Sequence, residues 1–313
     1  MHNVPIEYSD EVQNALSNGL PILGLESNVL SHGLPYPRNL EMFNACDEII
    51  RSNGVVPALT FIRDKRICIG ASPKDVELLT DDPKPIKVSA RDIALCIAQG
   101  KVGATTASAS IAICELAGIR IFSTAGLGGV HRDFSETLDV SADLHEISSR
   151  KTIVVSAGVK KFLDIPKTSE VLESLGVPVV GFGTSEFPAF YCRKSGAFLE
   201  SFSQDPIEIA TAAATHIETV GPGGFLILVA PSKEIALDDE LVEKAVQRSL
   251  INASSQGVRG KAITKFVMRA IDSETDNRSQ TANFDVMVEV VNAAAQIARS
   301  LKPEFFLDSV AKK

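Results

Sequence analysis

A carboxylate stands directly after an apolar run near the start of the chain, at Glu26. Residues 22–25 are expected to form a buried strand, and a carboxylate at the end of such a strand can serve as a general acid when desolvation raises its pKa. The ordinary alternative is a glutamate that caps a helix or anchors a loop. Its position alone leaves both roles open.

Two adjacent lysines, Lys160 and Lys161, follow the apolar run 153–155. Desolvation and a neighbouring cation can lower the pKa of an amine enough for it to form a Schiff base with a sugar carbonyl. Lys160 is nearer to the expected strand, and the charge of Lys161 beside it would lower its pKa further. Lys161 could simply face solvent, and the spacing does not select one of the two.

A third lysine, Lys87, lies between two apolar residues just before an expected helix start at Ser89. A cation beside a helix N-terminus can bind a phosphate group together with backbone N–H groups. The alternative is an edge-strand lysine that discourages aggregation.

Two loops are rich in glycine and threonine: residues 103–106 enter an expected helix, and residues 124–132 follow an expected strand. Backbone N–H groups in such loops can approach an anion closely, and threonine hydroxyls add further donors. The second loop does not match the dinucleotide-binding pattern, because a histidine occupies the third glycine position of G-x-G-x-x-G. The candidate substrate-binding residues of these loops are Thr105, Thr106, Thr124 and His131.

A polar run follows the second loop and contains Asp139, Ser141, Asp143 and His145. Carboxylates this dense can hold a hard divalent cation through oxygen atoms and water. An equally good interpretation is a helix start capped by Ser141 or Asp139.

The elements that must position these residues alternate between short β-type runs and helical patterns. This alternation predicts an α/β/α fold with a mixed, mostly parallel central sheet covered by helices on both faces, and ligands then bind beyond the carboxyl ends of the strands. Residues 1–313 are interpreted as a single domain, with a hairpin turn at 64–65 and a surface loop at 271–279. The expected strands are 22–25, 58–63, 66–70, 86–89, 120–124, 152–156, 177–182 and 224–229, and the expected long helices are 37–52, 106–117, 166–175, 206–220, 237–254 and 281–301.

Composition narrows the function classes. The 313 residues include 39 acidic and 31 basic side chains, a formal net charge of −8 that disfavours binding to nucleic acid or to an anionic membrane surface. No apolar run is long enough to span a membrane, and residues 1–7 lack the pattern of a signal peptide. The five cysteines form neither a disulfide framework nor a metal knuckle, so a cytoplasmic protein is expected.

Taken together, the ordered motifs resemble the pseudouridine-5′-phosphate glycosidase family, also called the indigoidine synthase A-like family. They include Ser-His-Gly-Leu-Pro-Tyr-Pro at 31–37, Lys-Val-Ser-Ala-Arg-Asp at 87–92 and Gly-Gly-Val-His-Arg at 128–132. The resemblance extends from about residue 8 to residue 300. The remaining matching segments are 25–27, 38–40, 54–58, 103–106, 139–144, 156–160, 163–168 and 186–190.

The resemblance implies a homotrimer of α/β/α subunits, each with one Mn²⁺, that reversibly converts pseudouridine 5′-phosphate and water to uracil and ribose 5-phosphate. It implies that Glu26 is the proton donor, that Lys160 is the nucleophile which forms an imine with the opened sugar, and that Asp139 binds the metal. The substrate-binding positions that it implies are Lys87, Ala107, Ser141, Ala142, Asp143 and Asn283.

An imine suits this reaction because a carbon–carbon bond to uracil has no leaving heteroatom that a carboxylate pair could protonate. The chain departs from the family pattern at Asn28, where threonine is common, at Ala90, where arginine is common, and in the segments 230–231, 264–268 and 275–280. Two alternatives therefore remain: an imine-forming lyase acting on another C-nucleotide or sugar phosphate, and a catalytically silent trimeric homologue.

Overall fold

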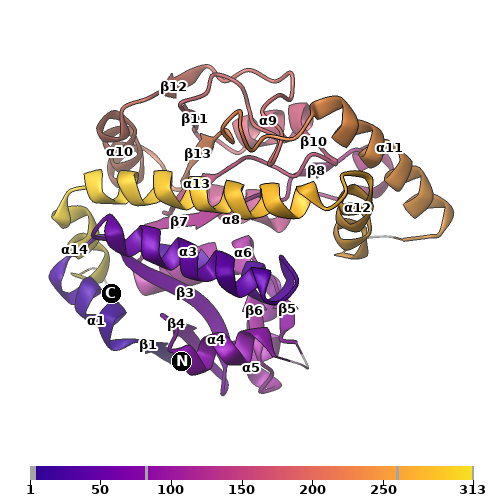
Figure 1. Cartoon of the computed structure of the whole chain (residues 1–313). Helices are drawn as coiled ribbons and strands as arrows, with labels where there is room; N and C mark the ends of the chain where they lie inside the picture. Colours follow the sequence, from indigo (N-terminus) through magenta and orange to yellow (C-terminus); the bar gives the residue numbers. More distant parts are fainter. Residues whose placement is uncertain (1–4, 82–83, 259–260, 312–313) are drawn as a thin grey trace.

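The computed structural model describes residues 5–81, 84–258 and 261–311; residues 1–4 of the N-terminal stretch considered above lie outside these ranges. Within them, eleven strands form one mixed sheet, and two more form a small antiparallel pair (Figure 1). The strands are β1 (Ile6–Tyr8), β2 (Ile22–Glu26), β3 (Val56–Arg63), β4 (Arg66–Ile69), β5 (Ile86–Val88), β6 (Gly103–Thr105), β7 (Ile121–Thr124), β8 (Val130–His131), β9 (Ile153–Ser156), β10 (Leu163–Asp164), β11 (Val179–Phe182), β12 (Ser201–Ser203) and β13 (Phe225–Val229).

The large sheet has the order β1-β4-β3-β2-β7-β9-β13-β11-β12, and β6 pairs with β3 and β5 beside this path. Within the described residues of this large sheet, the antiparallel strand pairs are β3 with β4 and β3 with β6. The predicted hairpin is confirmed, because Asp64 and Lys65 both adopt the left-handed φ that a tight two-residue turn requires. The small pair consists of β8 and β10.

Helices cover both faces of the sheet, as predicted. α3 and α13 run side by side across one face, while α6 and α8 pack together against the other (Figure 1). The helices are α1 (Asp10–Asn18), α2 (Asn28–His32), α3 (Arg38–Ser52), α4 (Pro73–Thr80), η1 (Ala90–Asp92), α5 (Ile93–Ala98), α6 (Ala107–Ala117), α7 (Phe134–Thr137), α8 (Ala142–Ser149), α9 (Ile165–Ser174), α10 (Pro206–Thr215), the π-helix η2 (His216–Val220), α11 (Asp239–Ser255), α12 (Lys261–Glu274), α13 (Arg278–Ser300) and α14 (Pro303–Ala311).

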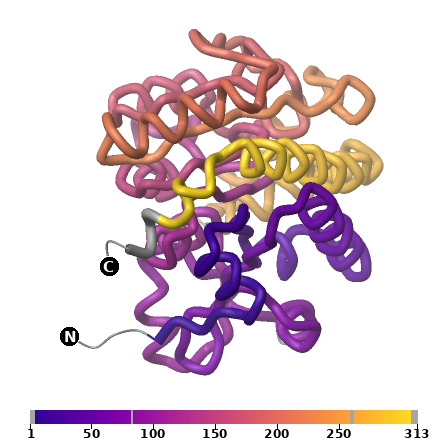
Figure 2. The backbone as a smooth tube through the Cα atoms, turned by 90° about the vertical axis from the view of Figure 1, so that its left-hand side faces the viewer, coloured from indigo at the N-terminus to yellow at the C-terminus, as the bar shows by residue number. Residues whose placement is uncertain are grey.

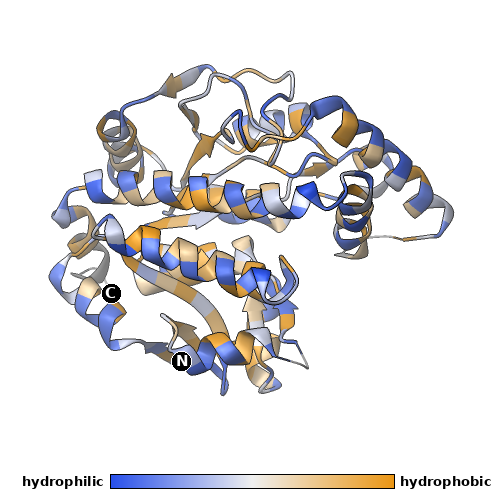
Figure 3. Ribbon diagram, in the orientation of Figure 1, coloured by the Kyte–Doolittle hydropathy of each residue, from blue (hydrophilic) through white to orange (hydrophobic). Residues whose placement is uncertain are grey.

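The packing follows from the sequence pattern. In α13 the buried residues Val286, Val290, Ala294 and Ile297 recur every three or four positions, which places them on one face toward the sheet. Figure 3 shows the resulting mixture of hydrophobic and hydrophilic residues along α3 and α13. On the other face, a Cβ at Gly24 would lie 2.4 Å from the Cys114 sulfur, so glycine allows α6 to approach β2.

The chain ends also pack together, because α14 lies against α1 (Figure 2). In the described residues, no helix combines the length and the apolar character that crossing a membrane would take.

One sequence-based expectation about the fold is wrong. The stretch 271–279 is not a surface loop, since α12 continues to Glu274 and α13 begins at Arg278. The tight turn between them is anchored by Thr275 and Ser279, which are buried and whose hydroxyl oxygens lie 3.1 Å apart. The polar composition of this stretch reflects a helix–helix turn whose hydroxyls are bonded internally.

Candidate active site

The predicted acid and nucleophile meet at one edge of the sheet. Glu26 is the last residue of β2, Thr124 is the last residue of β7, and Lys160 follows the end of β9. These three strands are adjacent and parallel, so their carboxyl ends lie together. This edge is where ligands bind in α/β sheets.

Glu26 is buried, with 7% of its surface exposed, and its Oε1 atom accepts a hydrogen bond from the Thr124 hydroxyl. Burial raises the pKa of Glu26 from 4.5 to about 7, although the Thr124 hydrogen bond and the charge of Lys160 both oppose the rise. A carboxyl group with this pKa is partly protonated at neutral pH. The structure therefore favours a general acid over a helix cap at this position.

Lys160 is partly buried and donates a hydrogen bond from Nζ to the Gly126 carbonyl at 2.7 Å. Desolvation lowers the pKa of this amine; the charges of Asp143 and Glu26 oppose the shift, and the charge of Lys87 adds to it. The neighbouring cation is thus Lys87 and not, as the sequence suggested, Lys161. A lowered pKa makes the neutral, nucleophilic amine more available.

Lys161 is not a solvent-facing residue either. It is 7% exposed, and its Nζ atom contacts Asp239 at 2.6 Å. The two lysines therefore differ in their surroundings: the charge of Glu26 acts on Lys160, whereas Lys161 is paired with Asp239.

Asp143 joins the loop after β7 to the start of α6. Its Oδ2 atom accepts a hydrogen bond from Gly128 N at 2.8 Å, and its Oδ1 atom accepts one from Ser108 N at 3.0 Å. The Ser141 hydroxyl in turn accepts from Asp143 N, which confirms the capping interpretation for Ser141 at the start of α8. Ala142 is the first residue of that helix, so the run 141–143 lies against the glycine loop.

The end of β6 and the start of α6 supply Thr105, Thr106 and Ala107, but their roles differ. The Thr105 hydroxyl is fully buried and donates to the Thr60 carbonyl at 2.6 Å, so it holds β6 against β3. Thr106 precedes the helix, and its hydroxyl lies 3.1 Å from that of Ser108. Ala107, the first helical residue, is buried beside them.

Lys87 lies in β5, which in the described residues pairs with β6 alone. It is exposed at the edge of the sheet, yet its charge lowers the pKa of both Glu26 and Lys160. The edge-strand interpretation and the substrate-facing interpretation are therefore compatible. Burial lowers the pKa of His32, and the charges of Lys84, Lys87 and Lys265 lower it further, so cations from two segments gather on this side of the site.

The side chains of His131 and Asp139 face each other. His131 Nε2 lies 3.8 Å from Asp139 Oδ2, and the backbone N–H of His131 donates to the Asp139 carbonyl at 3.0 Å. The Asp139 side chain is 36% exposed, while His145 points to solvent on α8. Among the described residues there is no group of three or more His, Cys, Asp or Glu side chains that could hold a metal.

Asn283 lies in the second turn of α13 and is partly buried. Its neighbour Phe284 packs under the Arg38 guanidinium, 4.6 Å from the ring centroid. The hydrogen bonds of the described residues do not connect Asn283 with Glu26 or Lys160.

Sequence reasoning missed several groups at the site because they are backbone atoms or small hydroxyls. The Gly126 carbonyl and the Ser108 N–H carry no side-chain signal. In the described part of the chain, Asn28 Oδ1 and Ser123 Oγ are buried without a hydrogen-bond partner, and these residues stand next to Ser27 and Thr124. Buried polar atoms are normally satisfied, so a bound molecule or water is expected to contact them.

Known proteins match this chain over most of its length. The family model described as indigoidine synthase A like protein matches residues 11–300. A pseudouridine-5′-phosphate glycosidase of Caldanaerobacter subterraneus is 42% identical over 296 residues, which is 95% of this chain and 96% of that protein. One from Staphylococcus aureus is 41% identical over 293 residues, covering 94% of this chain and 95% of that protein.

Two solved structures share the fold. A prealnumycin C-glycosynthase in complex with ribulose 5-phosphate is 32% identical, with a TM-score of 0.89 over 96% of this chain and 97% of that one. An indigoidine synthase A-like protein of Thermotoga maritima is 33% identical, with a TM-score of 0.86 over 95% of this chain and 97% of that one. This chain therefore belongs to the indigoidine synthase A-like family, together with relatives named pseudouridine-5′-phosphate glycosidases.

Proposed function

We propose that this protein is an enzyme that reversibly cleaves the carbon–carbon glycosidic bond of pseudouridine 5′-phosphate, giving uracil and ribose 5-phosphate. The observation that carries the proposal is the meeting of a carboxyl group of raised pKa, Glu26, with an amine of lowered pKa, Lys160. Groups whose pKa values are shifted toward neutrality are suited to proton transfer and nucleophilic attack. The names of the relatives supply the substrate.

The reaction needs an electron donor at C1 of the sugar, because the electrons of the broken bond leave with C5 of uracil. The Lys160 nitrogen bonds to C1 of the sugar as the ribose ring opens, and the ring oxygen takes up a proton. Glu26 then gives its proton to C5 of uracil. The nitrogen lone pair forms a C=N bond as the C1–C5 bond breaks, and water hydrolyses the imine to release ribose 5-phosphate and free Lys160.

The phosphate of the substrate is assigned to the side of the site that carries Lys87 and the start of α6. Backbone N–H groups at a helix N-terminus and a nearby ammonium group both favour an anion. The Ser108 N–H already donates to Asp143 and the Thr106 N–H donates to the Val88 carbonyl, so the N–H of Ala107 is assigned to the ligand. The hydroxyl of Thr124 is bonded to Glu26, so its role is to hold the acid.

We assign one Mn²⁺ per subunit to Asp139, with His131 beside it. The two side chains face each other, the carboxylate is partly exposed, and Mn²⁺ accepts both oxygen and imidazole ligands. When bound, the ion would add positive charge beside an anionic substrate. Because so few side chains are available, water would complete the shell and affinity would be modest.

The metal assignment predicts that thorough chelation abolishes uracil release and that added Mn²⁺ restores it. Asp139→Asn should raise the Mn²⁺ concentration needed for half-maximal activity, and direct titration of Mn²⁺ by electron paramagnetic resonance should show the same loss of affinity. Unchanged turnover after chelation would contradict the assignment.

We further propose a cytoplasmic homotrimer that acts on this small molecule and has no nucleic-acid or membrane partner. The net charge of −8 supports the exclusion of polyanionic partners. Light scattering of the purified protein would give the mass of the assembly.

An assay for uracil release from pseudouridine 5′-phosphate tests the main proposal. Release that disappears in Lys160→Ala would support it. Absence of release, with a borohydride-trapped adduct of ribulose 5-phosphate, would favour the alternative of an imine-forming lyase on another sugar phosphate; the ligand of the C-glycosynthase structure motivates that probe. Absence of both would indicate a catalytically silent homologue.

A further inference from the structure

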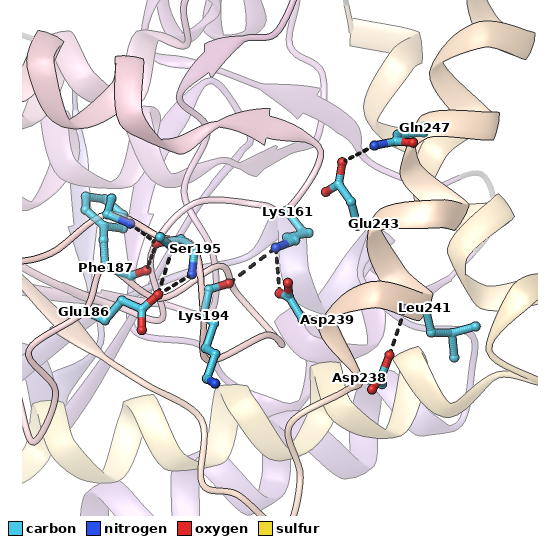
Figure 4. Close-up of polar contacts among 12 residues, drawn as sticks. Lys161, Glu186, Phe187, Lys194, Ser195, Asp238, Asp239, Leu241, Glu243 and Gln247 are labelled. Carbon is cyan, nitrogen blue, oxygen red and sulfur yellow. Dashed lines mark hydrogen bonds and ion pairs between the residues drawn. The ribbon is translucent and has the colours of Figure 1, made fainter.

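One buried cation takes no part in the proposed chemistry. Lys161 is more buried than the adjacent nucleophile, and an ammonium group is rarely buried without a partner. Its Nζ atom contacts Asp239 Oδ1 at 2.6 Å and the Lys194 carbonyl at 3.3 Å. Figure 4 shows Lys161 lying between these two groups, which come from the start of α11 and from the loop after β11.

A second interaction holds the backbone of the same residue. Arg132 donates from Nη2 to the Lys161 carbonyl at 2.8 Å. Arg132 is itself held by Glu243, to which it donates at 2.6 Å and 2.9 Å in a two-pronged ion pair. Asp239 and Glu243 are one helical turn apart on α11, so a single helix end fixes both the side chain and the carbonyl of Lys161.

The segment of the nucleophile is also held by backbone hydrogen bonds, to which Lys161 and Arg132 add a link to α11. In the backbone, the Lys160 N–H donates to Leu127 and the Lys160 carbonyl accepts from Leu163. Gly158, two residues earlier, has a left-handed φ of 85°. We propose that Lys161 is a positioning residue that, together with Arg132, fixes the backbone from which Lys160 reaches the substrate.

This inference rests on the proposed function, in which Lys160 must meet C1 of the sugar. Small displacements of a reacting group reduce the rate steeply, because near-attack geometry supplies much of the rate enhancement. The Lys161 side chain is directed to Asp239 while the Lys160 side chain is directed to the Gly126 carbonyl. Anchoring the Lys161 side chain therefore orients the Lys160 side chain.

The role is one of position and not of charge. The charged groups that act on Lys160 are Glu26, Asp143 and Lys87, whereas Lys161 faces Asp239 and Glu243 and lies near Cys192. Because neither Lys161 nor Asp239 is among the charges that act on Lys160, loss of Lys161 should leave the titration of Lys160 in place. A change in rate without a change in pH dependence is then the signature of positioning.

Lys161→Met tests the inference, because methionine keeps most of the stem and removes the ammonium group. The rate of borohydride trapping of ribose 5-phosphate on Lys160, located by mass spectrometry, should fall at least ~10-fold. The sugar concentration for half-maximal trapping should change by less than about 2-fold, since the assigned phosphate contacts lie on other segments, and the pH midpoint of trapping should not move. Amide hydrogen exchange in residues 158–163 should become faster.

Two further variants make the result specific. Asp239→Asn keeps the lysine, so it should slow trapping in the same direction, and the double variant should be no slower than Lys161→Met alone. Arg248→Met is the matched control, because it removes another ion pair of α11, at 3.0 Å to Glu274, without touching this segment. It should leave trapping and exchange unchanged.

Three outcomes would overturn the inference. Trapping at the wild-type rate in Lys161→Met would show that the contact is dispensable, and a shifted pH midpoint would show that Lys161 acts through its charge. Unaltered exchange in residues 158–163 would show that Lys161 does not hold the segment. Failure of the wild-type protein to trap the sugar would instead contradict the proposed function, while exchange would still report on the contact.

Discussion

At the scale of single residues, the site depends on two side chains whose pKa values move toward each other. Burial raises the pKa of Glu26 to about 7, and desolvation lowers that of Lys160. The sequence could indicate both residues because each follows an apolar run. It could not indicate that Lys87, 73 residues away from Lys160 in the chain, is the cation that acts on both.

These shifts predict a bell-shaped dependence of turnover on pH. Glu26 must be protonated to act as an acid, so activity is lost as the pH rises through its pKa near 7. Lys160 must be neutral, so activity is also lost as the pH falls below its lowered pKa. The profile of kcat/KM against pH measures both limbs, and a profile without an alkaline limb would contradict the role of Glu26.

The variant Thr124→Val should move one limb of the pH profile of kcat/KM and leave the other in place. The Thr124 hydroxyl lowers the pKa of Glu26, so its removal should raise that pKa further and move the alkaline limb to higher pH. The acid limb should stay in place, because Thr124 is not among the groups that act on Lys160. Movement of the alkaline limb to lower pH, or of both limbs together, would refute this account.

Glu26→Gln distinguishes acid catalysis from imine formation. Glutamine keeps the size of the side chain but cannot donate a proton as a carboxylic acid does. Uracil release should fall by ~10²- to 10⁴-fold, the usual contribution of a general acid. Borohydride trapping of ribose 5-phosphate on Lys160 should persist, and loss of trapping in this variant would mean that Glu26 also serves the nucleophile.

At the scale of elements, the sequence predicts the central strands and the long helices because apolar runs and helical periodicity encode them. Short strands such as β8 and β12 escape prediction, since two or three residues show no period. The polar stretch 271–279 was assigned to a loop because its composition hides the buried hydroxyl contact between Thr275 and Ser279. The Lys161–Asp239 contact escapes too, because it joins residues 78 positions apart.

In the loop that carries Lys160, we expect substitution of Gly158 to lower the stability of the protein. A Cβ at Gly158 would lie 1.9 Å from the Pro188 carbonyl oxygen, whereas at Gly183 it would meet nothing within 4 Å, although both residues have a left-handed φ. Gly183→Ala should therefore cost only the backbone strain, about 1 kcal/mol. Gly158→Ala should add a steric clash and cost about 3 kcal/mol or more, measured by denaturant unfolding. Equal losses for the two variants would argue against the clash.

At the scale of the whole molecule, the protein carries a negative net charge, whereas lysines gather near its site. The net charge of −8 opposes the approach of a phosphorylated substrate, yet Lys84, Lys87 and Lys265 gather from two segments near His32. Overall charge sets the long-range field, whereas a few cations at short distance decide binding. The preference for a phosphate ester must therefore come from the local group.

Lys87→Met tests this preference against a charge-matched control. It should raise KM for pseudouridine 5′-phosphate by ~10-fold or more, because it removes a charge-assisted contact, and should change KM for unphosphorylated pseudouridine much less. Lys101→Met lowers the net charge equally, but Lys101 acts on Cys96 and is not among the cations near Glu26, His32 or Lys160. It should leave both KM values unchanged at physiological ionic strength, where distant charges are screened. Equal effects of the two variants would show that the long-range field controls binding, and equal catalytic efficiency of the wild-type protein on both substrates would show that no phosphate subsite exists.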